Sequence, residues 1–131
     1  MLRTELPYRE DSAPLFEAVA DLPWAVFLDS GRHHPGQSRY DIIAAEPYAT
    51  LTTRGKLTEV RGESTELSRA DPLALLRQHL AIDPVAACDL PFGGGALGYF
   101  SYDLARRFER LPARAEDREK MPEMAVGIYD W

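Results

Sequence analysis

The chain has a single cysteine, Cys88, among its 131 residues, so no disulfide can form within it. Cys88 lies in the proline-flanked apolar stretch DPVAACDLP, where a free cysteine is typically a small buried hydrophobe rather than a nucleophile. Histidine is also scarce: His33 and His34 are neighbours in a loop, and His79 is distant. No cysteine or acidic residue stands at ligand spacing from them. We therefore expect no metal site in this chain.

Long apolar runs and an excess of positive charge are absent as well. No stretch approaches the roughly 18 apolar residues of a membrane span. The N-terminal MLRTELPYRED lacks the apolar region of a signal peptide. The formal net charge is −6, whereas a general nucleic-acid binder needs a basic surface. We expect a cytoplasmic protein that contacts neither membrane nor nucleic acid.

Catalytic motifs are missing too: the sequence has no nucleophile elbow, no Walker loop and no Ser-His-Asp order. One literal motif, Gly93-x-Gly95-x-x-Gly98, matches a dinucleotide fingerprint. However, Pro91 precedes it where a strand is required, and strand-like residues 96–100 follow where a helix should open. We interpret glycines 93–95 as a sharp bend or a close approach to another segment. No catalytic residue is predicted.

What is present is an ordinary globular composition, 45% hydrophobic and 27% charged, in about one domain's length. Strand pairs joined by short turns dominate the pattern, so the predicted fold class is α+β with mainly antiparallel sheets. The run 24–28, WAVFL, is apolar on both faces and predicts a central strand. Strands are expected at 4–9, 24–28, 39–45, 48–54, 56–61, within 62–69, at 96–100 and at 124–131, and helices at 12–22, 72–82 and 102–110.

The chain stops inside the apolar run 124–131 without a polar tail, so we expect it to be a fragment of a longer protein. Sheets that normally pair with strands elsewhere would leave an open edge or an apolar face exposed. We therefore expect the fragment to self-associate.

Three side chains suggest a binding site. Ser30 follows the strand 24–28, and Arg39 and Tyr40 begin the next strand after a short loop. A hydroxyl, a guanidinium and an aromatic ring at one end of a sheet suit a small zwitterion with an apolar side chain. The alternative is a structural arginine that pairs with Asp29 or Asp41.

A second group of charged residues lies in the predicted helix 102–110. It indicates a solvated helix face with ion pairs, or alternatively an anion or partner contact. Its members are Asp103, Arg106, Arg107 and Glu109.

Four phrases of the sequence resemble a known family: LPWAVFLDSG, SRYDIIAAEP, LPFGGGALGYFSYDLARRFERLP and MAVGIYDW. They resemble the N-terminal region of the chorismate-utilising enzymes, the family of anthranilate synthase component I. The phrases SYDLARRFE and AVGIYDW are more similar to the aminodeoxychorismate branch. The resemblance implies that residues 1–131 form an N-terminal domain within a two-layer α/β assembly with antiparallel sheets.

The resemblance also implies a reaction. The full-length enzyme would replace the hydroxyl of chorismate by an amino group, giving 4-amino-4-deoxychorismate for para-aminobenzoate and folate biosynthesis. Ammonia would come from a glutamine amidotransferase subunit, component II, and Mg²⁺ would be the cofactor. The chorismate and Mg²⁺ residues would lie in a C-terminal region absent here, so the fragment is expected to be inactive and without a cofactor. The alternatives are an anthranilate synthase N-terminal domain and a stand-alone amino-acid sensor.

The family's tryptophan site has two matching motifs. A Leu-Leu-Glu-Ser motif is similar to residues 27–30, FLDS, and a Ser-Arg-aromatic motif is similar to residues 38–40, SRY. The resemblance implies that Ser30, Arg39 and Tyr40 would bind tryptophan. The sequence departs from the pattern at Gln37, where an aromatic residue is expected.

Overall fold

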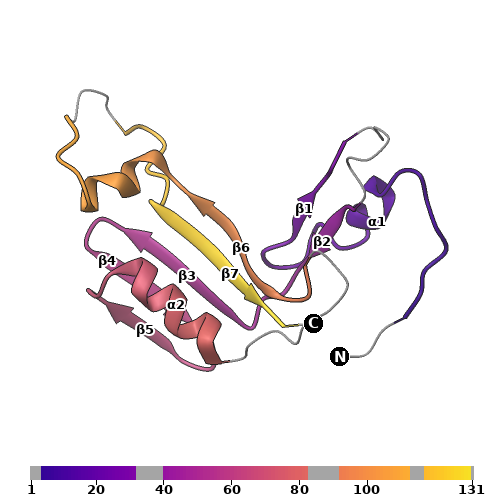
Figure 1. The fold of residues 1–131 in the computed structure, drawn as a ribbon, viewed down its shortest axis with the longest axis horizontal. Coiled ribbons are helices and arrows are strands. Elements are labelled where there is room, and N and C mark those ends of the chain that lie inside the picture. The colour runs from indigo at the N-terminus through magenta and orange to yellow at the C-terminus, as the bar shows by residue number, and fades with distance from the viewer. Residues whose placement is uncertain (1–3, 32–39, 83–91, 113–116, 131) are drawn as a thin grey trace.

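The computed structural model describes residues 4–31, 40–82, 92–112 and 117–130. Within these ranges the fold is α+β with antiparallel sheets, as predicted (Figure 1). Cys88, His33 and His34 lie outside the described residues. The elements are α1 Ala13–Glu17, β1 Val26–Leu28, β2 Ile42–Ala44, β3 Ala49–Arg54, β4 Leu57–Arg61, β5 Thr65–Ser68, α2 Pro72–Ile82, β6 Gly95–Phe100, the 3₁₀ helix η1 Tyr102–Arg107 and β7 Met124–Tyr129.

The larger sheet has five strands in the order β5-β4-β3-β7-β6, and all neighbours are antiparallel. β3, β4 and β5 follow one another along the chain, and a two-residue turn at Gly55 and Lys56 closes the predicted first hairpin. The last strand, β7, lies between β3 and β6 (Figure 1). All six β7 residues are buried, so residues 124–129 of the predicted strand form an interior strand rather than an edge.

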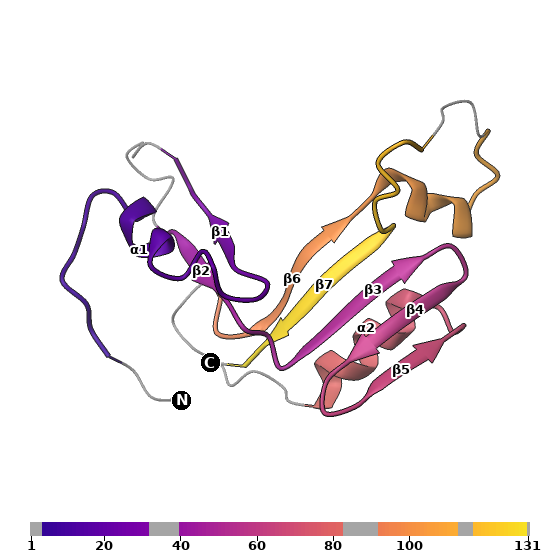
Figure 2. The same ribbon diagram turned by 180° about the vertical axis from the view of Figure 1, so that it is seen from behind.

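The hydrophobic core lies between this sheet and α2, which crosses one sheet face, in front in Figure 1 and behind in Figure 2. Alternate residues of β3 are buried, and Leu51 pairs with Val126 on the helix side. Leu76 of α2 packs onto them. The helix begins as predicted, with Asp71 accepting a hydrogen bond from the Leu73 N–H at 3.3 Å and proline at the first helical position.

The smaller sheet pairs β1 with β2 alone, so the prediction of a central strand at 24–28 is wrong for the described part of the chain. The backbone turns at Trp24, whose φ is 57°, and extended structure starts only at Val26. The apolar side chains serve other contacts: the Phe27 ring stacks on Phe16 of α1 at 5.3 Å. The hydroxyl of the buried Tyr129 donates to the Trp24 carbonyl oxygen at 2.8 Å and so joins the two sheets. Burial raises the pKa of Tyr129.

Two other N-terminal predictions need correction. Residues 4–9 form no strand, since Pro7 cannot donate a ladder hydrogen bond and no described strand runs beside them. The helix expected at 12–22 ends at Glu17, with proline in its first turn as predicted. After Glu17 the chain continues in turns. The Val19 N–H donates to the Phe16 carbonyl oxygen, and the Leu22 N–H donates to the Val19 carbonyl oxygen.

The glycine motif is not a nucleotide-binding turn, because β6 runs on directly from it and no helix opens there. Glycines 93–95 form the sharp bend that was one of the two expectations, with φ of 122° at Gly94 and 127° at Gly95, and a close approach occurs further on, at Gly98. A Cβ at Gly98 would lie 2.1 Å from the Ala125 carbonyl oxygen and 2.7 Å from the Val126 Cα. Only glycine therefore permits β6 to lie against β7 as it does. The helix expected at 102–110 is the shorter η1, which buries Leu104 in the core.

A buried hydroxyl pair generates a stability prediction. Thr53 and Thr58 are opposite each other on β3 and β4, are fully buried, and share a hydrogen bond of 2.9 Å between their hydroxyls. Thr53→Val leaves the buried Thr58 hydroxyl without a hydrogen-bond partner, so we expect a loss of about 1–3 kcal/mol in the free energy of unfolding. The double variant T53V/T58V has no buried hydroxyl without a partner, so its free energy of unfolding should return most of the way to the wild-type value. Urea unfolding followed by circular dichroism measures both, and a double variant less stable than T53V would contradict the prediction.

Candidate functional site

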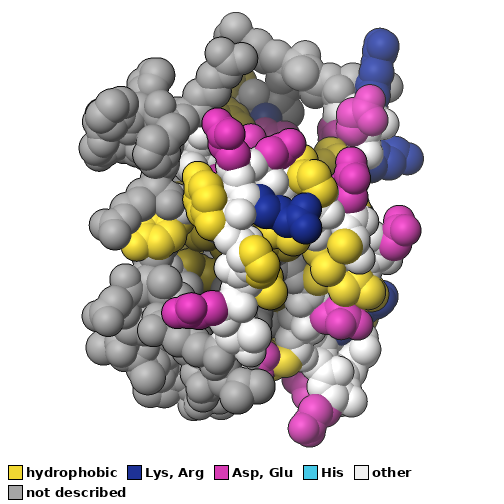
Figure 3. Space-filling model, turned by 90° about the vertical axis from the view of Figure 1, so that its right-hand side faces the viewer, with side chains coloured by type: hydrophobic (Ala, Val, Ile, Leu, Met, Phe, Trp, Pro, Cys, Tyr) yellow, Lys and Arg dark blue, Asp and Glu magenta, His cyan; other side chains and the backbone are white. Residues whose placement is uncertain are grey.

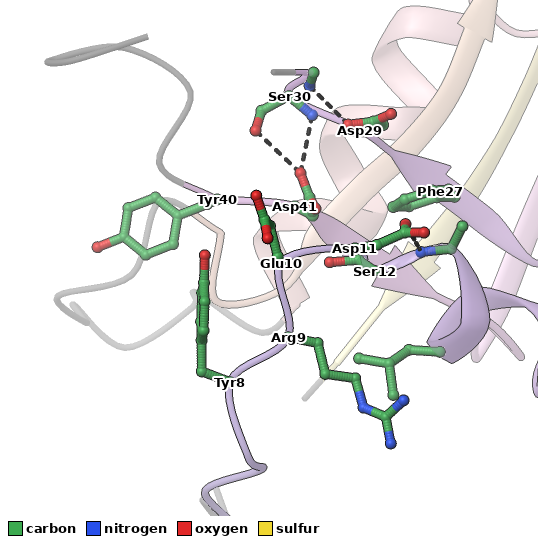
Figure 4. A pocket seen from close by; sticks show the side chains of 13 residues that line it. Tyr8, Arg9, Glu10, Asp11, Ser12, Phe27, Asp29, Ser30, Tyr40 and Asp41 are labelled. Atoms are coloured by element: carbon green, nitrogen blue, oxygen red, sulfur yellow. Dashed lines mark hydrogen bonds between the residues drawn. The ribbon is translucent and has the colours of Figure 1, made fainter. Parts of the chain in front are cut away.

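A pocket opens beside the β1–β2 sheet, at the end where β1 stops. Its volume is about 1140 Å³, and it is open to solvent on one side. The strands supply one wall, and the N-terminal segment up to the start of α1 supplies the other (Figure 4). The lining residues are Tyr8, Arg9, Glu10, Asp11, Ser12, Ala13, Leu15, Phe27, Asp29, Ser30, Gly31, Tyr40 and Asp41.

Ser30 and Asp41 form the polar centre of this pocket. The Ser30 backbone N–H and its hydroxyl both donate to Asp41 Oδ1, each at 3.0 Å, and Figure 4 shows the two bonds. Nearby, the Gly31 N–H donates to Asp29 Oδ1 at 2.6 Å. These bonds hold the chain after β1 against the chain before β2, so that Ser30 faces the pocket.

The charge state of Asp41 follows from these contacts. The hydrogen bond from the Ser30 backbone N–H lowers the pKa of the Asp41 carboxyl below its ordinary value of 3.8. A hydrogen bond from the Ser12 hydroxyl lowers this pKa further, desolvation raises it, and the Ser30 hydroxyl lowers it by the smallest of these effects. Asp41 is therefore an anion at neutral pH, and it fixes the Ser30 hydroxyl as its donor.

The structure brings two of the three predicted binding residues together. Ser30 and Tyr40 both line the pocket, and the Tyr40 side chain is exposed in it. Arg39 lies outside the described residues, as do Ser38 and Gln37. The hydroxyl and the aromatic ring therefore line the same pocket, and their binding role stays a prediction.

Sequence reasoning missed the N-terminal wall. Tyr8 and Arg9 line the pocket from the N-terminal segment, although nothing in residues 4–12 marks them as ligand-binding. Among the described lining residues, Arg9 is the single cation beside four acids, Glu10, Asp11, Asp29 and Asp41. Such a pocket offers oxygen acceptors to an ammonium group and aromatic surfaces to an apolar side chain.

The surface around this site is partly apolar. Figure 3 shows the side of the molecule that carries the N-terminal segment and the smaller sheet, where hydrophobic side chains are interspersed with acidic ones. Leu28 at the end of β1 is 45% exposed.

The charged group on η1 has a structural role. Arg106 pairs with Asp103 at 2.8 Å, as expected for residues three apart, and also donates to the Leu111 carbonyl oxygen at 2.9 Å. Arg107 donates to the carbonyl oxygen of Gly55 in the β3–β4 turn. The Arg106 bonds hold η1 and the segment after it together, and the Arg107 bond joins η1 to the larger sheet.

The described residues contain no group of three or more His, Cys, Asp or Glu placed to hold a metal ion. None of their helices is both long enough and apolar enough to cross a membrane.

Comparison with known proteins finds relatives along almost the whole chain, although no family model matches it. Aminodeoxychorismate synthase component 1 of Klebsiella aerogenes is 52% identical over 96% of this chain, and that of Escherichia coli (strain K12) is 50% identical over the same share. Anthranilate synthase component 1 of Thermus thermophilus is 35% identical over 98% of the chain. The chain spans about 29% of the length of each of these relatives. The predicted resemblance is confirmed.

The Ser30–Asp41 contact generates a prediction about pH. Because the pKa of Asp41 is lowered by folding, its ionised form stabilises the fold above about pH 4, and this stabilisation is lost as the pH falls through the folded-state value. A carboxyl-carbon NMR titration should place the pKa of Asp41 below 3.8. In Ser30→Ala the pKa should rise only part of the way, since the backbone donor remains. A value of 3.8 or above in the wild type would contradict the geometry.

Proposed function

We propose that this chain is the N-terminal part of an aminodeoxychorismate synthase component 1. The observation that carries the proposal is the 52% and 50% identity to two proteins of that name over 96% of the chain. The identity to an anthranilate synthase component 1 is lower, 35%, which favours the aminodeoxychorismate branch. The complete enzyme would convert chorismate and ammonia into 4-amino-4-deoxychorismate, and a glutamine amidotransferase subunit, component II, would supply the ammonia.

In our proposal this chain is a supporting domain of the enzyme, because it matches only about 29% of the length of the relatives. Hard oxygen ligands such as paired carboxylates, together with the substrate, hold Mg²⁺ in enzymes of this kind. In our proposal the metal and chorismate are bound by the part of the enzyme that this chain does not match.

We further propose that the pocket beside β1 and β2 binds tryptophan through Ser30, Arg39 and Tyr40. The pocket supports this by its chemistry: acceptors at Ser30 and Asp41 suit the ammonium group, and the rings of Tyr40 and Phe27 suit the indole. The ligand carboxylate would pair with a guanidinium. The volume of about 1140 Å³ is large for one amino acid, so we expect weak binding by this chain alone.

The first prediction concerns activity. The 131-residue chain with chorismate, Mg²⁺ and ammonia should form no 4-amino-4-deoxychorismate, because it lacks the metal and substrate sites of the proposed enzyme. A complete aminodeoxychorismate synthase component 1, assayed in parallel, is the positive control. Turnover by the short chain above the uncatalysed rate would show that a catalytic site lies within it.

The second prediction concerns the ligand. Calorimetric titration should show tryptophan binding that is lost in Arg39→Ala and kept in the exposed control Arg69→Ala. Indole-3-propionate lacks the ammonium group and tryptamine lacks the carboxylate, so both should bind at least tenfold more weakly than tryptophan. Loss of binding in Arg9→Ala with full binding in Arg39→Ala would assign the carboxylate to the N-terminal wall instead. Binding retained in both arginine variants would refute the pocket.

These two experiments also separate two of the alternative functions, a sensor and a purely structural domain, from the proposed one. A stand-alone amino-acid sensor would bind tryptophan tightly without needing any further part of a longer enzyme. A purely structural domain would bind none. An anthranilate synthase fragment would behave like the proposed domain in both assays, and the identities of the relatives argue against it.

A further inference from the structure

The two walls of the pocket meet at one carboxylate. From the strand side, the Ser30 N–H and hydroxyl both donate to Asp41 Oδ1 at 3.0 Å. From the N-terminal side, the Ser12 hydroxyl donates to the same carboxyl group. Further along, the Phe16 ring of α1 stacks on Phe27 of β1 with a centroid separation of 5.3 Å. These contacts attach the N-terminal segment to the smaller sheet and make it a fixed wall of the pocket.

Ser12 serves the pocket rather than its own helix. A serine at the N-cap usually accepts a hydrogen bond from a backbone N–H of the first helical turn. Ser12 is the N-cap of α1, but its side chain makes no such bond. Asp11 accepts the Ala13 N–H instead, at 2.9 Å. The Ser12 hydroxyl is therefore available to donate to Asp41.

The wall held in this way carries an aromatic ring, Tyr8, into the pocket. Tyr8 is 89% exposed, although it lines the pocket. In Figure 4 its side chain points from the N-terminal segment toward Tyr40, which is 40% exposed. So exposed a ring adds almost nothing to the packing of the fold. Its position opposite a second exposed ring suits a ligand.

We propose that Tyr8 is a further ligand-binding residue of this pocket, which holds a flat aromatic group against Tyr40, and that Ser12 is the residue that positions it. The inference rests on the proposed function, because it takes this pocket as the ligand site. It adds a selectivity to that function. Aromatic pairs stack or meet edge to face, and each pair contributes more than its buried area alone.

The size of the pocket supports a role for the N-terminal wall. Its volume of about 1140 Å³ is above the range of roughly 300–1,000 Å³ that is typical of ligand sites, and one side is open to solvent. A ligand that touched only the strand side would leave much of its surface in water. A ring between Tyr8 and Tyr40 would be covered on both faces. The pocket should therefore select aromatic over aliphatic side chains.

Indole is the probe that tests the ring contact, because it has neither the ammonium nor the carboxylate group that other residues would bind. Tyr8→Ala should weaken indole binding by about three- to tenfold, the effect of one lost aromatic pair. Tyr8→Phe keeps the ring and should bind indole like the wild type. Tyr102→Ala removes an 81% exposed tyrosine on η1, outside the pocket, and is the matched control. NMR titration with indole measures all four dissociation constants, and circular dichroism establishes that each variant is folded.

A double-mutant cycle tests the positioning role of Ser12. Ser12→Ala should weaken indole binding, and Ser12→Thr, which keeps the hydroxyl, should restore it. In the Tyr8→Ala background Ser12→Ala should have no further effect, because Ser12 acts through Tyr8. Equal weakening by Ser12→Ala in both backgrounds would mean that the serine is merely structural. Without ligand, Ser12→Ala should raise the pKa of Asp41 toward 3.8, whereas Ser12→Thr should leave it low.

Parallel titrations with tryptophan separate this inference from the proposed function. Tryptophan and indole binding unchanged in Tyr8→Ala, with tryptophan binding lost in Arg39→Ala, would overturn the inference and leave the tryptophan site intact. Indole binding that depends on Tyr8, with tryptophan bound no more tightly than indole, would support the inference and refute the tryptophan site. Binding of neither compound by the wild type would overturn both.

Discussion

Strand β7 pairs with β3 through five residue pairs and with β6 through six, and it is buried along its whole length. Without it, β6 has no described strand partner, and β3 to β5 are a three-stranded meander under α2. The pairing depends on Gly98, because any side chain there would meet the Ala125 carbonyl oxygen. The same strand carries Tyr129, which bonds to Trp24 and so holds the smaller sheet. The larger sheet and the support of the pocket therefore rest on one long-range strand insertion.

Features with local causes could be predicted from the sequence. The Gly55 turn and the Thr-rich alternation predict the β3–β4 hairpin, and Asp71 with Pro72 predicts the start of α2, because each signal acts within a few residues. Features that depend on residues far away in the sequence could not be predicted. The run 24–28 predicts a central strand, but the Phe27 ring stacks on Phe16 of α1, and the Trp24 carbonyl accepts a hydrogen bond from a residue 105 positions away.

The residues of the candidate site show the same contrast between local and distant causes. Ser30 and Tyr40 could be expected to meet, because the strands beside them pair antiparallel across one loop. The N-terminal wall could not be foreseen, since residues 8–13 reach the pocket through tertiary packing and carry no motif. Asp41 accepts two hydrogen bonds from Ser30, a contact that no sequence motif predicts. The family was recognised from whole phrases of sequence, and the relatives confirm it.

The position of β7 also affects how the molecule is made. A ribosome extends a chain at roughly 5–20 residues per second, and Met124 follows its partner Thr53 by about 70 residues. During that interval the β3 edge and, later, the β6 edge of the nascent chain have no strand between them. Both edges are then open to wrong partners, so synthesis itself includes a period of aggregation risk that ends only when β7 leaves the exit tunnel.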